Sequence, residues 1–84
     1  MKSEMADIIF CASIKQIKVE LEIPLHISAN ELVLALNDAY QLGIRINDVK
    51  NCYFQSESPV ALLKGNKKLS EFGVRNGTII YYVE

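Results

Sequence analysis

The 84-residue sequence has little of what most enzyme and metal sites require. It contains one histidine, His26, and two cysteines, Cys11 and Cys52, which lie far apart and lack the Cys-x-x-Cys spacing of a zinc or redox site. Its four glycines are dispersed, so there is no glycine-rich phosphate loop. We therefore expect no catalytic, metal or cofactor site, and we interpret the cysteines as small buried apolar residues.

The sequence also lacks a strong charge of one sign and any long apolar run. Nine basic and ten acidic residues give a formal net charge of -1, which provides no overall attraction for nucleic acid or anionic membranes. The apolar stretches are too short to span a bilayer, and residues 1–10 do not have the pattern of a signal peptide. These absences predict a cytoplasmic protein that neither binds nucleic acid nor inserts into a membrane.

What is present is the composition of one small folded domain. A hydrophobic content of 50% with 23% charged residues favours a packed core over disorder. A chain of this length buries only about 60% of the surface that it exposes when unfolded, so a large enclosed active site is not expected. We predict a single domain over residues 1–84, in which residues 1–6 form a disordered N-terminal extension.

Two segments near the N-terminus predict a β-hairpin. Residues 17–23 alternate strictly between apolar and charged side chains, and the apolar members are Ile17, Val19, Leu21 and Ile23. Residues 7–14 are rich enough in β-branched and aromatic side chains to form the partner strand, with a turn near residues 13–16. Both faces of that partner strand are apolar, and we predict that Ile9 and Cys11 point inward.

A full set of helix signals follows the hairpin. Ser28 can cap the first turn, and Glu31 can accept a hydrogen bond from the Ser28 amide, which together make a capping box. The expected apolar stripe consists of Leu32, Ala35, Leu36 and Ala39. Gly43 is the expected left-handed cap. This pattern predicts a helix over about residues 29–41.

Two short strands are predicted after the helix. Residues 51–55 form the first, with Cys52 and Phe54 inward and Tyr53 outward. A Ser/Pro turn follows, and residues 60–63 form the second strand.

The last part of the sequence predicts a turn-rich segment and a final strand. Residues 68–74 are expected to pack as a compact irregular segment around Leu69, Phe72 and Val74. Asn76-Gly77 is a tight-turn signal, and it leads into a strand that is expected to lie beside the first strand, with Ile80 and Tyr82 facing the helix. A mixed sheet of four to five strands packed on one long helix, an α+β fold, would bury both apolar surfaces.

This order of elements resembles ubiquitin-like proteins with the β-grasp fold. The motifs that carry the resemblance are the hairpin ending "VELEIP", the capped helix from Ser28, and the segments "LLKGNKKLSEFGV" and "GVRNGTIIYY". Within that superfamily, "LEIP" and "LSEFGVRNGT" resemble the bacterial YukD/EsaB group, which is associated with type VII (ESX) secretion systems. The resemblance implies a cytosolic adaptor or regulatory protein that works by binding and not by catalysis.

The outward residues of the third and last strands are the first candidates for a docking surface. The matching face of ubiquitin is its main docking patch, so the resemblance implies this role for Tyr53, Tyr81 and Val83. Tyrosine is enriched at interfaces, although exposed aromatic residues on strands often only shield the backbone. A second candidate is a basic turn that could attract an acidic protein partner or simply be solvated; it contains Lys64, Lys67 and Lys68.

Two other functions fit a ubiquitin-like fold. A carrier used in conjugation or sulfur transfer needs an exposed Gly-Gly carboxyl end, whereas this sequence ends in "YVE" directly after the expected last strand, so we expect no such chemistry. The chain could also be a ubiquitin-like domain excised from a larger membrane protein. The favoured interpretation is an adaptor whose partner is a cytosolic component of the secretion machinery.

Overall fold

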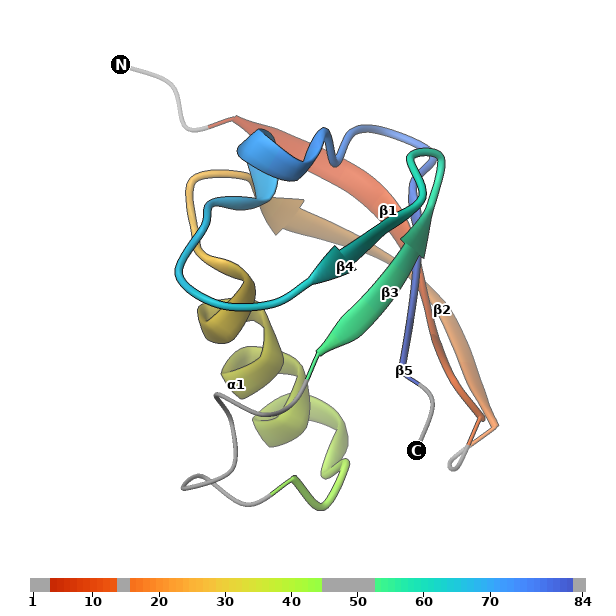
Figure 1. Ribbon diagram of the computed structural model, residues 1–84. Coiled ribbons are helices and arrows are strands. Elements are labelled where there is room, and N and C mark those ends of the chain that lie inside the picture. Colours follow the sequence, from red (N-terminus) through yellow and green to blue (C-terminus); the bar gives the residue numbers. More distant parts are fainter. Residues whose placement is uncertain (1–3, 14–15, 45–52, 83–84) are drawn as a thin grey trace.

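The structure, a computed structural model, describes residues 4–13, 16–44 and 53–82, and within them a five-stranded sheet curves around one α-helix (Figure 1). In chain order the elements are β1 (Met5–Ala12), β2 (Ile17–Pro24), α1 (Ala29–Tyr40), β3 (Phe54–Glu57), β4 (Ala61–Leu63), the 3-10 helix η3 (Leu69–Phe72) and β5 (Ile79–Tyr82). The sheet order is β2-β1-β5-β3-β4. Strand β5 is parallel to β1 and the other neighbours are antiparallel. The predicted α+β fold, with the last strand beside the first, is confirmed.

Helix α1 begins where the capping box predicts. The Ser28 hydroxyl accepts a hydrogen bond of 3.1 Å from the Glu31 amide, and the Glu31 carboxylate accepts one of 3.0 Å from the Ser28 amide. The helix residues that are buried against the sheet are Ala29, Leu32, Val33 and Leu36. The predicted stripe is therefore wrong at Ala35 and Ala39, which are exposed, because the helix turns its larger Val33 toward the sheet and leaves the small alanines in solvent.

The helix ends at a glutamine. Gln41 adopts the left-handed conformation, with φ 53° and ψ 56°, and its amide donates to the Asn37 carbonyl. Gly43, the predicted cap, also has a positive φ of 81°, but it lies beyond the cap, in the segment that leaves the helix. The Asn37 side chain fixes this exit, because its amide bonds both the carbonyl and the N–H of Ile44, at 2.8 and 3.0 Å.

The inward face of β1 is the opposite of the predicted one. Ile8 and Phe10 are fully buried, whereas Ile9 and Cys11 lie on the other face and are half-buried. The physical reason is the hairpin register, in which Phe10 opposes Val19. Residues directly opposed in an antiparallel pair share a face, so the inward apolar set of β2 determines the inward set of β1.

Two strand boundaries also differ from the predicted ones. Met5 and Ala6 belong to β1, and Ala6 is 2% exposed, so the expected disordered extension over residues 1–6 is wrong at these two positions. Strand β3 continues to Glu57 although a turn was expected earlier, because the Ser56 side chain is buried and its hydroxyl donates a bond of 2.8 Å to the Pro59 carbonyl. The predicted inward residue Cys52 lies outside the described residues.

The core between sheet and helix contains a chain of aromatic rings. The ring of Phe10 lies 5.6 Å from those of Tyr40 and Phe54, and Phe54 packs edge-on against Tyr82 at 5.8 Å. Such pairs contribute about 0.5 to 1.5 kcal/mol each beyond the area that they bury. Ile80 is fully buried, so the predicted inward residues of β5 are confirmed. The alternate residues of that strand therefore point to the opposite face.

The segment before β5 packs as predicted. Leu69 and Val74 are buried, and Phe72 packs against the core from η3. Gly73 ends η3 with a φ of 84°, in the left-handed region that disfavours side chains. Gly77, at the predicted tight turn, has a φ of 91° and donates its amide to the Asp7 carbonyl at 2.9 Å. This contact places the start of β5 against β1.

A candidate docking surface on the outer sheet face

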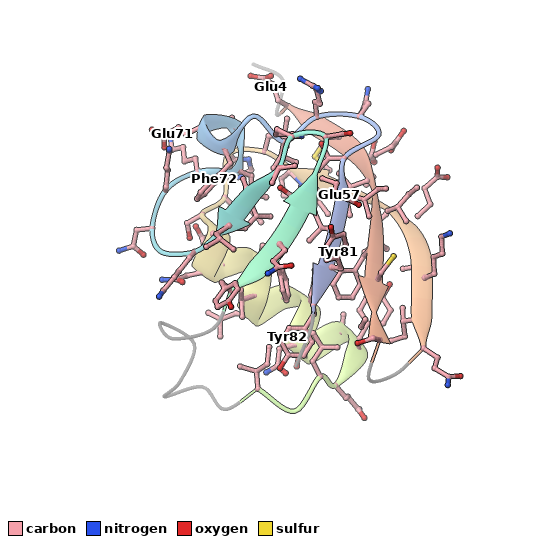
Figure 2. All side chains as sticks on the ribbon, turned by 45° about the vertical axis from the view of Figure 1, so that its right-hand side comes forward. Glu4, Glu57, Glu71, Phe72, Tyr81 and Tyr82 are labelled. Atoms are coloured by element: carbon pink, nitrogen blue, oxygen red, sulfur yellow. The ribbon has the colours of Figure 1, made fainter. Side chains whose placement is uncertain are left out.

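The face of the sheet that points away from α1, here called the outer face, joins side chains from every strand. Across β4, β3 and β5, the directly opposed residues are Leu62, Gln55 and Tyr81. In the next row Glu57 opposes Ile79. Figure 2 shows Glu57 and Tyr81 close to each other on this side of β3 and β5. The β3–β4 hairpin and β5 thus build one continuous surface.

Large apolar side chains are exposed on the β3–β4 hairpin and the residue before it. Val60 is 87% exposed, Leu62 is 55% exposed and Tyr53 is 42% exposed. Only two other large hydrophobic residues in the described part of the chain are as open to solvent, Met5 and Leu34. Single exposed apolar residues are ordinary, whereas several within one hairpin are typical of an interaction surface.

The hairpin and β5 also enclose an open hollow of about 330 Å³. Val60, Leu62 and Tyr81 supply its apolar walls, and Gln55 and Glu57 supply polar groups. Pockets for small molecules have volumes of about 300 to 1,000 Å³ and bury most of their ligand. This hollow is at the lower end of that range and is too open to bury most of a ligand, so it is better suited to one side chain of a protein partner.

Tyr81 and Glu57 interact at the side of this hollow. The pKa of Tyr81 is raised above its ordinary value of 10.0, first because the ring is partly buried and second because its hydroxyl forms a hydrogen bond with the Glu57 carboxylate. The negative charge of Glu57 acts in the same direction. Burial and Glu57 therefore both favour the neutral form of Tyr81.

Of the three predicted docking residues, Tyr81 lines the hollow and Tyr53 is exposed directly before β3. Val83 lies outside the described residues. The prediction omitted Val60, Leu62 and Glu57. The run Val60–Leu63 is apolar throughout, so the sequence did not reveal which of its residues point outward, and Glu57 fell in the expected turn.

The basic turn is a separate surface. Lys64, Lys67 and Lys68 are exposed, but the Lys67 ammonium lies 5.0 Å from the centre of the Phe72 ring, a cation–π contact of about 0.5 to 1 kcal/mol. The Lys67 carbonyl accepts a bond of 3.0 Å from the Ala29 amide at the start of α1. The turn follows β4 on the side away from β5 (Figure 1), so the lysines and the tyrosines do not form one site.

The described residues contain few other groups that could bind a metal or react. No group of three or more His, Cys, Asp or Glu side chains there is arranged to hold a metal ion. His26 is exposed, and Cys11 is a free, half-buried thiol on the outer face. In the same part of the chain, no helix has the length and apolar character needed to cross a membrane.

The chain has a ubiquitin-like β-grasp fold. It is similar to a ubiquitin-like domain from tubulin-binding cofactor B, with a TM-score of 0.77 and 22% identity over 99% of this chain and 92% of that chain. The C-terminal ubiquitin-like domain of mouse tubulin-specific chaperone e gives a TM-score of 0.70 and 11% identity, over 100% and 92%. The UBL domain of Plasmodium falciparum Dsk2 gives 0.59 and 15%, over 95% and 100%. These likenesses concern the fold alone.

The family follows from the sequence itself. Residues 9–81 match the family model described as WXG100 protein secretion system (Wss), protein YukD. The chain therefore belongs to the YukD family, as its motifs indicated. A comparison with curated proteins gives no match.

Proposed function

We propose that this chain is a non-catalytic, cytoplasmic adaptor or regulatory protein of a bacterial type VII (ESX) secretion system. It acts by binding a protein of the secretion machinery through the outer face. Membership of the YukD family, whose description names the WXG100 protein secretion system, supports the system. The observation that carries the mode of action is the exposed apolar surface formed by Tyr53, Val60, Leu62 and Tyr81.

This surface has the composition of a protein interface. Tyrosine combines a large rigid ring with a polar end, and it is enriched where proteins dock. The apolar residues surround a hollow into which a partner side chain can be inserted, and residues that fill such pockets carry most of the binding energy. The exposed β2 edge, with Lys18, Glu20 and Glu22, would form a polar rim.

The proposal includes action without conjugation. The sequence contains four glycines, and none of them is adjacent to another, which supports this part of the proposal. Intact mass spectrometry of the protein after incubation with cytosol and ATP tests this part. We expect an unchanged mass, and a covalent adduct or a thiocarboxylate would contradict it.

The docking surface is tested by a pull-down from native cytosol, followed by titration of the secretion protein that is recovered. Replacing Tyr53 and Tyr81 with serine should weaken binding severely, because each interface anchor contributes about 2 kcal/mol or more, while thermal melts show a folded protein. The matched control is the double change of Lys67 and Lys68 to glutamate, which should alter mainly the association rate and its salt dependence. If the folded tyrosine variant binds as tightly as the parent, the outer face is not the docking surface.

A further inference from the structure

We infer that the hollow between the β3–β4 hairpin and β5 receives one basic side chain, arginine or lysine, that the partner protein presents within an apolar segment. The inference rests on the proposed function, since it specifies the chemistry of the partner that the outer face binds. Glu57 takes the cationic end, and Val60 and Leu62 contact the apolar part.

The shape and the walls of the hollow suit such a side chain. Arginine and lysine have apolar stems that pack along hydrophobic surface while the charged end stays at a polar group. Leu62 and Tyr81 stand in one row across the sheet, with Gln55 between them, and Val60 lies on the same hollow. A stem that passes over these side chains ends next to Glu57. The Tyr81 ring adds a π-face, which attracts a cation as well as an apolar group.

Glu57 retains capacity for a partner. An ionised carboxylate can accept about four hydrogen bonds, and the Tyr81 hydroxyl uses one of these positions. Glu57 is exposed, and the structure records no salt bridge between it and any lysine or arginine of the described residues. A guanidinium or ammonium group would supply the missing countercharge.

The charge of the whole outer face favours a cationic segment over an acidic one. The outward strand residues in the described part of the chain include four carboxylates and one lysine, namely Asp7, Glu20, Glu22, Glu57 and Lys18. The lysine turn lies beyond β4 and does not offset them (Figure 1). A surface of this sign attracts basic segments and repels acidic ones, which selects partners through both rate and specificity.

A library of random peptides displayed on phage provides a probe that does not depend on the partner's identity. Peptides selected on the full chain should share an arginine or lysine next to apolar residues. The best peptide, made synthetically, should bind Glu57→Gln about tenfold more weakly than the parent, since hydrogen bonds to charged groups are among the stronger ones. Asp38→Asn is the matched control, because it removes one exposed carboxylate charge from α1, away from the outer face, and it should change binding little.

Three further measurements complete the test. Changing the basic residue of the peptide to glutamine should weaken binding to the parent and have little additional effect with Glu57→Gln. The amide signals that shift on titration should include Gln55, Leu62 and Tyr81. Salt should weaken binding to the parent more than binding to Glu57→Gln. Thermal melts of each variant show that the protein is folded.

The inference is overturned if no peptide is selected, if the selected peptides share no basic residue, or if Glu57→Gln binds them as well as the parent does. These results are distinct from failure of the proposed function. A cytosolic partner that depends on Tyr53 and Tyr81 but not on Glu57 would leave the docking surface intact and remove the basic-residue pocket. If basic peptides need Glu57 but the secretion partner binds the tyrosine variant as tightly as the parent, the basic-residue pocket is supported. The outer face is then not the surface that binds the secretion partner.

Discussion

The hydroxyl of Thr78 donates a hydrogen bond of 2.7 Å to the backbone carbonyl of Ser58, which lies 20 residues earlier in the chain. Thr78 is fully buried, and its hydroxyl also accepts a bond of 3.0 Å from the Arg75 amide. Ser58 begins the turn that carries Val60, the most exposed apolar residue of the docking surface. One buried side chain directly before β5 therefore holds the turn that shapes the hollow.

Removal of that hydroxyl should loosen the hairpin. Thr78→Val keeps the volume but leaves the Ser58 carbonyl and the Arg75 amide without this partner, and the loss of a hydrogen bond costs about 0.5 to 1.5 kcal/mol. Urea unfolding measures the loss. Thr78→Ser keeps the hydroxyl and should destabilise less than Thr78→Val. A valine variant as stable as the parent would show that the turn does not depend on this bond.

The start of α1 allows a comparison of a cap with a core residue. Ser28→Ala removes the side chain that accepts the Glu31 amide bond and should destabilise by about 1 kcal/mol. Leu36→Ala empties a site in the buried stripe and should cost about 2 to 5 kcal/mol. Denaturant titration gives both values. The ranking is the decisive result, and a harmless Leu36→Ala would contradict the buried face of the helix.

The same cap predicts a dependence of stability on pH. Hydrogen bonds from the Ser28 backbone and side chain, with a smaller contribution from the charge of His26, lower the pKa of Glu31 below its ordinary 4.5. The folded state therefore binds this proton less tightly than the unfolded state does. The contribution is present above pH 4.5 and is lost as the pH falls through the folded-state pKa. The unfolding midpoints of the parent and Glu31→Gln should differ most at neutral pH and converge in acid, and a constant difference would contradict the capping interaction.

The helix end offers a change that should stabilise the protein. Gln41 is held in the left-handed region, where a side chain costs roughly 1 to 2 kcal/mol and glycine does not. Gln41→Gly should increase the free energy of unfolding. The gain should not exceed about 1 kcal/mol, because glycine also increases the conformational entropy of the unfolded chain, and this offsets part of the stabilisation. Gly43→Ala, at a φ of 81° with open space around the added carbon, should do the opposite. Thermal or urea unfolding of both variants checks the two signs.

These positions show which parts of the fold the sequence could reveal. The hairpin, the capped helix and the final strand were predictable because alternation, capping and turn residues act over a few neighbours, as at Ser28 and Gly77. The inward face of β1 was mispredicted because both of its faces are apolar, and only the pairing of Phe10 with Val19 decides between them. Pairing between strands is not visible in the local pattern.

The residues of the candidate site were also only partly predictable from the sequence. Tyr53 and Tyr81 were predicted as docking residues from the resemblance and from strand alternation. Glu57 was not predicted, because the serine-rich segment around it has the composition of a turn. In the structure, the buried Ser56 hydroxyl donates a hydrogen bond to the Pro59 carbonyl within the hairpin, and the strand extends to Glu57. The contact of Glu57 with Tyr81 joins residues from β3 and β5, and it depends on the register that the folded sheet establishes.

That contact makes a direct spectroscopic prediction. The ionisation of Tyr81 is isolated by comparing the ultraviolet titration of the parent with that of Tyr81→Phe, which removes one of four tyrosines. Its midpoint should lie above 10.0, because partial burial, the hydrogen bond to Glu57 and the charge of Glu57 all favour the neutral phenol. Glu57→Gln should lower the midpoint but not return it fully, since burial is the largest cause and remains. Glu20→Gln should leave it in place. An identical midpoint in the parent and in Glu57→Gln would mean that the Glu57 carboxylate does not contact the Tyr81 hydroxyl in solution.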